Sequence, residues 1–176
     1  MMVQVSVESV RASLMSPQRL VILKAVDGDR HLPIWIGAFE ADAIAMVLQG
    51  VQAPRPMSHD LLGDAIIALG ATVSHVVVHD LRHDVFYASV VLGQGERELI
   101  LDSRPSDSIA LAVRMDCPIY VESSVIDRAG IVEEPDVRDE RKEPPDEPDS
   151  ETLEVFREFI EELSFDATRS DQEEDG

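Results

Sequence analysis

Alternating apolar and polar positions mark the beginning of the chain. Residues 3–10 (VQVSVESV) place valine at every second or third position, which approximates the period of a half-buried strand. Two more strand-like runs follow at 19–26 and 30–36, and the Asp-Gly-Asp stretch at 27–29 tolerates the positive φ of a tight turn. The pattern therefore predicts a strand and then a β-hairpin. Because Pro33 cannot donate a backbone hydrogen bond, it places its strand at an edge or a bulge.

Helical patterns occupy the next part of the chain. Residues 38–48 are rich in helix formers and place an apolar stripe on one face, formed by Phe39, Ala43, Met46 and Val47. A loop with two prolines follows at 51–57. A second helix is expected from Ser58, a suitable N-cap, to Leu69, just before a glycine.

The remaining elements of the first 130 residues come in a mixed order. Three strand-like runs at 71–81, 84–93 and 96–102 predict an antiparallel meander. A third helix at 105–115, a short strand at 117–121 and a helical turn at 123–130 complete the series. The order predicts an α+β fold with a mostly antiparallel sheet and three main helices, because strands and helices do not alternate strictly.

The chain changes character after Gly130. Residues 131–150 are charged, contain four prolines and predict a disordered acidic linker after a domain spanning 1–130. Within 151–176 an amphipathic helix is expected, with one apolar face formed by Leu153, Phe156, Ile160 and Leu163. A helix this short is marginal alone, so it is a candidate for docking on a protein partner.

Charge and composition narrow the class of protein. The 176 residues carry a net charge of -20, of which residues 131–176 contribute -14 and residues 1–130 contribute -6. Long-range repulsion of nucleic acid is expected, so any binding to it needs a local site. One cysteine excludes an internal disulfide, and neither a secretion signal nor a membrane-spanning run is visible. A cytoplasmic protein without membrane association is expected.

The densest polar cluster is Asp102-Ser103-Arg104-Pro105-Ser106-Asp107, where a strand meets a helix. Free backbone N–H groups at such a junction suit an anion, and the two carboxylates, the arginine and the hydroxyls could hold a divalent ion beside a phosphate. The alternative is capping, in which the serines satisfy helix donors and Arg104 pairs with Asp102.

A second polar cluster, Arg55-Pro56-Met57-Ser58-His59-Asp60, precedes the second helix. His59 could move protons near neutral pH, with Asp60 orienting it or binding a metal. Capping of the helix explains the same residues equally simply. Glu40, in the first turn of the first helix, is a further candidate carboxylate, although first-turn acids commonly serve the helix dipole.

Other features give weaker signals for chemistry. His75, His79 and His83 recur every four residues, but the valines between the first two predict a strand and Asp80 to His83 resembles a turn, which disfavours a metal stripe. Cys117 lacks a CxxC partner and is expected to be a small buried residue. P-loop, Rossmann, GxSxG and HExxH motifs are not found in the sequence.

Four segments carry a resemblance to a known family: LPIWIGAFEADAIAMVLQG at 32–50, RPMSHDLL at 55–62, VFYASVVL at 85–92 and DSRPSDSIALAVRMDCPIYVES at 102–123. In this order they resemble the bifunctional nuclease (BFN, DUF151) domain family, and the charged C-terminal part is similar to that of actinobacterial members. The resemblance implies an α+β domain that self-associates and a nuclease activity toward DNA and RNA.

The resemblance leaves two functional hypotheses. In the first, the protein is a metal-assisted phosphodiesterase with nucleic acid as substrate. Asp102 and Asp107, with Glu40 or Asp60, would hold Mg²⁺ or Mn²⁺. Arg104 would stabilise charge on the phosphate and His59 would move protons, with Arg55, Ser103 and Ser106 as substrate contacts.

In the second hypothesis, the protein is a non-catalytic, homo-oligomeric binding or regulatory module. Its polar clusters would cap helices and line a subunit interface, while the terminal helix recruits a protein partner. If the acidic side chains and Arg104 lie together in one pocket, the first hypothesis is favoured. If each of them only caps its own helix, the second is favoured.

Overall fold

The computed structural model describes residues 1–12 and 18–132. They form eight strands, which are β1 Met2–Ala12, β2 Arg19–Ala25, β3 Arg30–Ile36, β4 Thr72–Arg82, β5 Val85–Gln94, β6 Arg97–Ser103, β7 Ile119–Glu122 and β8 Ile131–Val132. The helices of this part are α1 Ala38–Leu48, α2 Ser58–Ala68, α3 Pro105–Met115 and α4 Ser123–Ala129. The predicted acidic linker and terminal amphipathic helix lie outside the described residues, apart from the first two linker positions, which form β8.

All eight strands belong to one sheet, in the order β6-β5-β4-β7-β1-β2-β3-β8. Neighbouring strands pair antiparallel except β4 and β7, which pair parallel because α3 carries the chain back across the sheet between β6 and β7. The expected α+β class, the hairpin and the meander are confirmed. The short strand β8 was not predicted, since two residues carry no period.

The prediction that Pro33 places its strand at an edge holds only locally, because β8 lies beyond β3 in the sheet. Pro33 pairs with Ile22 of β2 on one side. On the other side β8 pairs only with Arg30 and His31, so within the described residues Pro33 lies on the uncovered part of β3. A missing N–H costs least at such a position.

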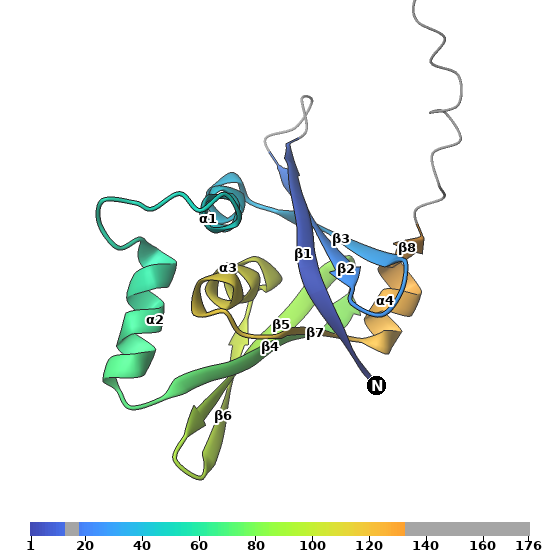
Figure 1. Cartoon of the computed structure of the whole chain (residues 1–176). Coiled ribbons are helices and arrows are strands. Elements are labelled where there is room, and N and C mark those ends of the chain that lie inside the picture. The colour runs from blue at the N-terminus through green and yellow to red at the C-terminus, as the bar shows by residue number, and fades with distance from the viewer. Residues whose placement is uncertain (13–17, 133–176) are drawn as a thin grey trace, which may run out of the picture. The chain divides into compact units, whose positions relative to one another are not determined.

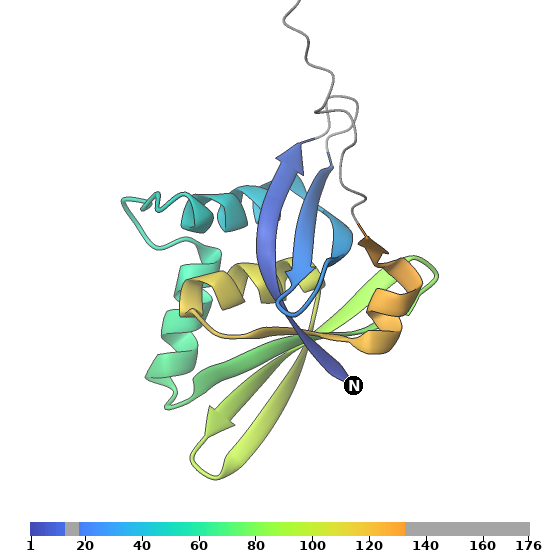
Figure 2. The ribbon, with the colours of Figure 1, turned by 45° about the vertical axis from the view of Figure 1, so that its right-hand side comes forward.

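The three longer helices gather at one side of the molecule, with α4 apart from them (Figures 1 and 2). Helix α3 contacts α1, α2, β4 and β5, so it is the central helix of the fold. Its side chains Ile109 and Leu111 are almost fully buried, together with Ile44 of α1 and Leu23 and Leu32 of the sheet. One hydrophobic core therefore holds α3 in place, and α1 and α2 are arranged around it.

Two details of the predicted helices are wrong. Phe39 does not belong to the buried face of α1, since its side chain is 86% exposed and the buried residues are Ala41, Ala43 and Ile44. Ser58 is the first helical residue of α2 and not its N-cap, which is Met57. The Met57 N–H donates to Asp60 Oδ2 at 2.7 Å, so Asp60 provides the stabilisation expected from Ser58.

The histidines of β4 do not form a common face. The turn after β4 lies at His83 and Asp84, both with positive φ, and not at Asp80 to His83, because the strand continues to Arg82. His75 packs edge-on against the Tyr120 ring at 5.5 Å between centroids, while His79 is exposed. Bulges on both sides of the valine run change the direction of the side chains.

None of the helices in the described part of the chain is both long and apolar enough to cross a bilayer.

Candidate functional site

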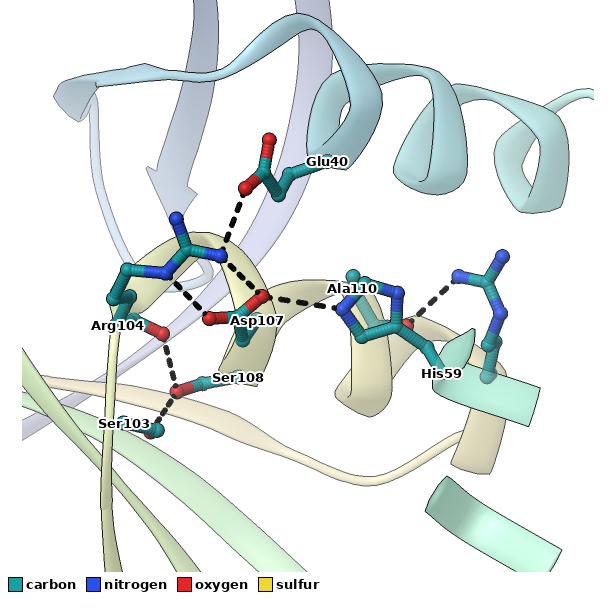
Figure 3. A network of polar contacts seen from close by, with 8 residues as sticks. Glu40, His59, Ser103, Arg104, Asp107, Ser108 and Ala110 are labelled. Atoms are coloured by element: carbon teal, nitrogen blue, oxygen red, sulfur yellow. Dashed lines mark hydrogen bonds and ion pairs between the residues drawn. The ribbon is translucent and has the colours of Figure 1, made fainter. Parts of the chain in front are cut away.

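The site begins at the junction of β6 and α3. Arg104 is the N-cap residue of α3 with an extended backbone, and Pro105 starts the helix. This geometry turns the Arg104 side chain toward the first turn of its own helix. There Nε donates to Asp107 Oδ2 at 2.7 Å and Nη2 donates to Asp107 Oδ1 at 3.0 Å, a two-point contact between guanidinium and carboxylate (Figure 3).

Helix α1 adds a second carboxylate to the same guanidinium. Glu40 Oε1 lies 2.8 Å from Arg104 Nη2, and the Glu40 side chain is only 17% exposed. Arg104 itself remains 66% exposed. These contacts use Nε and Nη2, so in the described part of the chain Nη1 has no ion-pair partner.

Helix α2 contributes a histidine on the other side of Asp107. His59 Nε2 lies 3.3 Å from Asp107 Oδ1, and the His59 side chain is mostly buried. In Figure 3, Asp107 lies between Arg104 and His59 at the N-terminal end of α3, and Glu40 reaches the Arg104 guanidinium from α1. These four residues, here called the Arg104 cluster, come from three helices and unite candidates that the sequence places up to 67 positions apart.

A pair of serines, one half-buried and one buried, fixes the backbone beneath the cluster. The hydroxyls of Ser103 and Ser108 lie 2.5 Å apart, and the Ser108 hydroxyl donates to the Arg104 carbonyl at 3.0 Å. Ser108 is fully buried. Because these bonds join the last residue of β6 to the first turn of α3, they limit the movement of Arg104.

The electrostatics of the cluster favour its charged forms. Burial of Asp107 opposes its ionisation, but hydrogen bonds from Arg104 and His59 outweigh burial and lower the pKa of the carboxyl. The hydrogen bond to Asp107, reinforced by Glu40, raises the pKa of Arg104. Asp107 is therefore an anion at neutral pH and can accept a hydrogen bond from the N–H of His59 Nε2, which leaves Nδ1 of that tautomer as a hydrogen-bond acceptor.

Asp60 belongs to a second ion pair on α3. Arg114 Nε donates to Asp60 Oδ1 at 2.7 Å, and Arg114 Nη1 donates to the Ala110 carbonyl at 3.0 Å. The backbone bond from Met57, together with Arg114, lowers the pKa of Asp60 although burial raises it. Asp60 thus caps α2 and holds Arg114.

The other candidates lie apart from the Arg104 cluster. Asp102 is exposed on β6 opposite Ser89, and among the described residues its side chain makes no hydrogen bond or ion pair. The alternative in which Arg104 pairs with Asp102 is wrong, because Arg104 pairs with Asp107 and Glu40. Ser106 is buried, and Arg55 is exposed in the loop before α2.

The carboxylates expected to bind a metal ion are Asp102, Asp107, Glu40 and Asp60. Within 1–12 and 18–132, no group of three or more His, Cys, Asp or Glu side chains is placed to hold an ion. The two carboxylates of the Arg104 cluster, Glu40 and Asp107, both contact the guanidinium. The guanidinium therefore occupies the position between them that a metal cation would need. As arranged here, the expected set of Asp102, Asp107, Glu40 and Asp60 does not fit a divalent metal.

Two residues of the site region were missed by sequence reasoning. Arg114 is 94% buried on α3, and Ser108 is fully buried beneath Arg104. The signal for Arg114 was its position in an otherwise apolar helix, where a charge requires a partner. Cys117, expected to be inert, has a thiol pKa raised mainly by burial, so it has little thiolate character.

Residues 21–134 match the family described as the bifunctional nuclease domain. A protein of Mycobacterium tuberculosis named as uncharacterized is 41% identical over 163 residues, which cover 93% of this chain and 96% of that protein.

Plant proteins match over a shorter part. Bifunctional nuclease 2 of Arabidopsis thaliana is 30% identical over 110 residues, 60% of this chain and 33% of that protein. Bifunctional nuclease 1 of Oryza sativa subsp. indica is 28% identical over 120 residues, 66% of this chain and 36% of that protein. The chain therefore spans about a third of the length of these plant relatives.

Proposed function

This chain belongs to the bifunctional nuclease domain family, and from this premise we propose that it hydrolyses phosphodiester bonds of DNA and RNA at the Arg104 cluster. The observation that supports the proposal is the meeting of a mostly exposed arginine with an Asp-His pair on one helix end. A phosphodiester needs a cation for its oxygens and a base for the attacking water, and these residue types supply both.

The proposed reaction assigns one task to each side chain. Arg104 donates from Nη1 to a non-bridging phosphate oxygen. Asp107 accepts from His59 Nε2, so Nδ1 takes a proton from water as the water oxygen bonds to phosphorus. The bond from phosphorus to the leaving ester oxygen breaks, and this oxygen takes a proton from solvent. Arg104 and His59 act on the reacting groups, whereas Asp107 positions both.

Glu40 limits the affinity of the cluster for a phosphate. With neutral His59, the side chains of Glu40, Asp107 and Arg104 together carry a charge of minus one, which repels an anion. Because Glu40 contacts only one end of the guanidinium, an approaching phosphate can compete for Arg104 while Asp107 keeps its two-point contact. Glu40 is therefore proposed to restrain Arg104 until substrate binds.

The proposed activity could also depend on a divalent metal ion. Mg²⁺ or Mn²⁺ would have to enter with the substrate, because the carboxylates of the cluster already pair with Arg104. No step of the proposed reaction requires it.

The decisive experiment measures cleavage of end-labelled single-stranded DNA and RNA by the full-length chain, with EDTA, Mg²⁺ or Mn²⁺. We expect Arg104→Gln and Asp107→Asn to lower kcat/KM about 100-fold or more. The first removes the cation that contacts the phosphate, and the second removes the carboxylate that orients Arg104 and His59. The matched controls are Arg128→Gln and Asp64→Asn, which change the same charges at exposed positions outside the cluster.

The same variants also reveal a contaminating nuclease. If Arg104→Gln and Asp107→Asn cleave as fast as their controls while remaining folded by circular dichroism, the Arg104 cluster is not the active site.

A non-catalytic role is the second candidate function. It is favoured by the mutual pairing of Glu40, Arg104, Asp107 and His59, which joins α1, α2 and α3 as a structural brace. In that case the two cluster variants have a lower thermal stability than their two controls, and none of the four preparations cleaves nucleic acid. We also propose that residues 151–176 bind a protein partner and that the protein is cytoplasmic. Both proposals are compatible with either candidate function.

A homo-oligomer is proposed on a separate observation, the outer strand β6. This strand ends the sheet, and six of its seven residues are exposed, including Leu99, Ile100 and Leu101. Its free edge can pair with the same strand of a second copy. Antiparallel pairing centred on Ile100 would place the Ile100 side chains of the two copies opposite each other.

A further inference from the structure

A cavity of about 500 Å³ lies beside the Arg104 cluster and has no part in the reaction proposed above. Its walls come from the end of α1, the loop at 50–57, the start of α2 and the side chain of Arg114 on α3. This volume lies within the range of roughly 300–1,000 Å³ that is typical of pockets for small organic ligands.

Arg114 gives the cavity a buried cation with unused donors. Its side chain is 6% exposed, and Nε and one N–H of Nη1 are bonded to Asp60 and the Ala110 carbonyl. In the described part of the chain, Nη2 contacts only the Met57 sulfur, at 4.0 Å. A thioether is a weak acceptor, so an anionic oxygen in the cavity would be a much better partner for Nη2.

The charges around the cavity favour an anion. Arg55 lines it as a second cation and is exposed, while Asp60 supplies one negative charge. The three side chains together carry one positive charge, in a protein whose net charge is -20. This local excess is suited to a ligand that carries one or two negative charges.

The rest of the cavity is mainly apolar. Its wall includes Met46, Val47, Val51, Ala53, Pro54, Pro56 and Met57. Such a surface packs against a flat ring and excludes water from it. The ligand that fits both parts has a ring system joined to an anionic group.

The position of the cavity relates it to the Arg104 cluster. Asp60, which holds Arg114, follows His59 directly, and Arg114 comes seven residues after Asp107 on α3. Seven residues of helix span about 10 Å, a length comparable to two or three stacked nucleotides of a strand. A nucleic-acid strand at the cluster would pass close to this cavity.

We propose that this cavity is a nucleotide-binding subsite, in which Arg114 and Arg55 hold a phosphate and the apolar wall holds the base. The proposal deepens the proposed nuclease function and rests on it for the claim that the nucleotide belongs to the substrate strand. The nucleotide itself is identified by the pairing of an apolar wall with two arginines.

The test measures binding of adenosine 5′-monophosphate to the full-length chain by isothermal titration calorimetry at low salt. Adenosine and inorganic phosphate are titrated separately. We expect the monophosphate to bind at least tenfold more tightly than either part alone. Arg55→Gln should weaken its binding at least threefold, whereas the control Arg128→Gln, at an exposed position of α4, should leave it unchanged.

Two further variants complete the design. Arg114→Lys keeps the charge next to Asp60 but removes the planar fork, so it should weaken binding of the monophosphate even where the fold is intact. Val51→Trp, at an exposed position of the rim, should weaken binding by filling the cavity, and its fold is checked by circular dichroism.

Arg104→Gln separates this proposal from the proposed function. This variant should lose cleavage and still bind the monophosphate with unchanged affinity. Binding that depends on Arg104 and not on Arg55 would overturn the subsite, as would no detectable binding at millimolar concentration. Binding that depends on Arg55 in a chain without nuclease activity would support a nucleotide pocket and overturn only the proposed function.

Discussion

Arg104 is paired with two carboxylates, and two thirds of its side chain is exposed. An exposed ion pair contributes little to stability, in general up to about 1 kcal/mol. The second carboxylate therefore adds little to the fold, and its effect on the charge presented to a phosphate becomes the more important one.

The first prediction at this scale concerns Glu40. Glu40→Gln removes one negative charge from the Arg104 cluster but keeps the shape of the side chain. We expect the affinity for single-stranded DNA to rise about two- to tenfold at low salt, measured by fluorescence anisotropy, with cleavage retained. A large loss of cleavage would instead assign Glu40 a direct role, such as holding a metal ion.

The second prediction concerns acid stability. The pKa of Asp60 is lower in the folded chain than its ordinary value of 3.8, so the unfolded chain takes up the proton more readily as the pH falls. The stabilisation from ionised Asp60 is therefore complete well above pH 3.8 and is lost as the pH falls through the folded-state pKa.

Urea unfolding of the wild type and of Asp60→Asn tests this linkage. Asp60→Asn should be less stable at pH 7, because it removes the carboxylate that pairs with buried Arg114. The difference in unfolding free energy should shrink as the pH falls below about 4. A difference that stays constant from pH 7 to pH 3 would contradict the assigned role, and exposed Asp64→Asn provides the control.

At the scale of elements, α3 and β6 have opposite properties. Helix α3 is buried along most of its length and contacts both α1 and α2, so it fixes where their first turns lie. Strand β6 ends the sheet with an exposed apolar edge. The candidate site thus depends on the most rigidly packed helix, whereas the proposed contact between copies depends on the least covered strand.

The prediction at this scale concerns Ile100, which is 65% exposed. If two copies pair through β6, Ile100→Lys places two like charges close together across the interface and should lower the mass of the particle. Size-exclusion chromatography with light scattering measures that mass. The control Leu69→Lys changes the exposed leucine that caps the C-terminal end of α2. Equal masses for the wild type and Ile100→Lys would exclude β6 as the interface.

At the scale of the whole molecule, charge is distributed unevenly along the chain. Residues 131–176 carry -14 of the net charge of -20, and positive charge is concentrated in arginines of the preceding part. Since a polyanion is repelled by this charge at long range, binding of nucleic acid must depend on local contacts made at short distance.

The last prediction follows from this asymmetry. A chain ending at Glu134 should cleave single-stranded DNA faster than the full-length chain at low salt, because repulsion of the substrate is reduced. The advantage should diminish as salt screens the charges. Thermal unfolding checks that the shorter chain is folded, and equal rates at every salt concentration would show that the acidic segment has no influence on cleavage.

Much of the fold was determined by the sequence alone. Periods of two and of three to four residues located the strands and helices of residues 1–130, because burial of one face is a local property of each segment. The Asp-Gly turn and the limits set by glycine follow from backbone sterics at single residues. The predictions failed where a neighbour decides exposure, as at Phe39, or where another side chain provides the cap, as at Ser58.

Only the tertiary structure decided which polar residues share a site. The sequence offered Asp102 and Asp107 as equivalent carboxylates, but residue 102 lies on an exposed strand face, whereas the first turn of α3 directs residue 107 toward Arg104 and His59. The packing of α1 and α2 against α3 brings Glu40 and His59 to the Arg104 cluster. The same packing places Asp60 against Arg114, away from the cluster. Such pairings depend on distances between segments that are remote along the chain, and local periodicity contains no information about them.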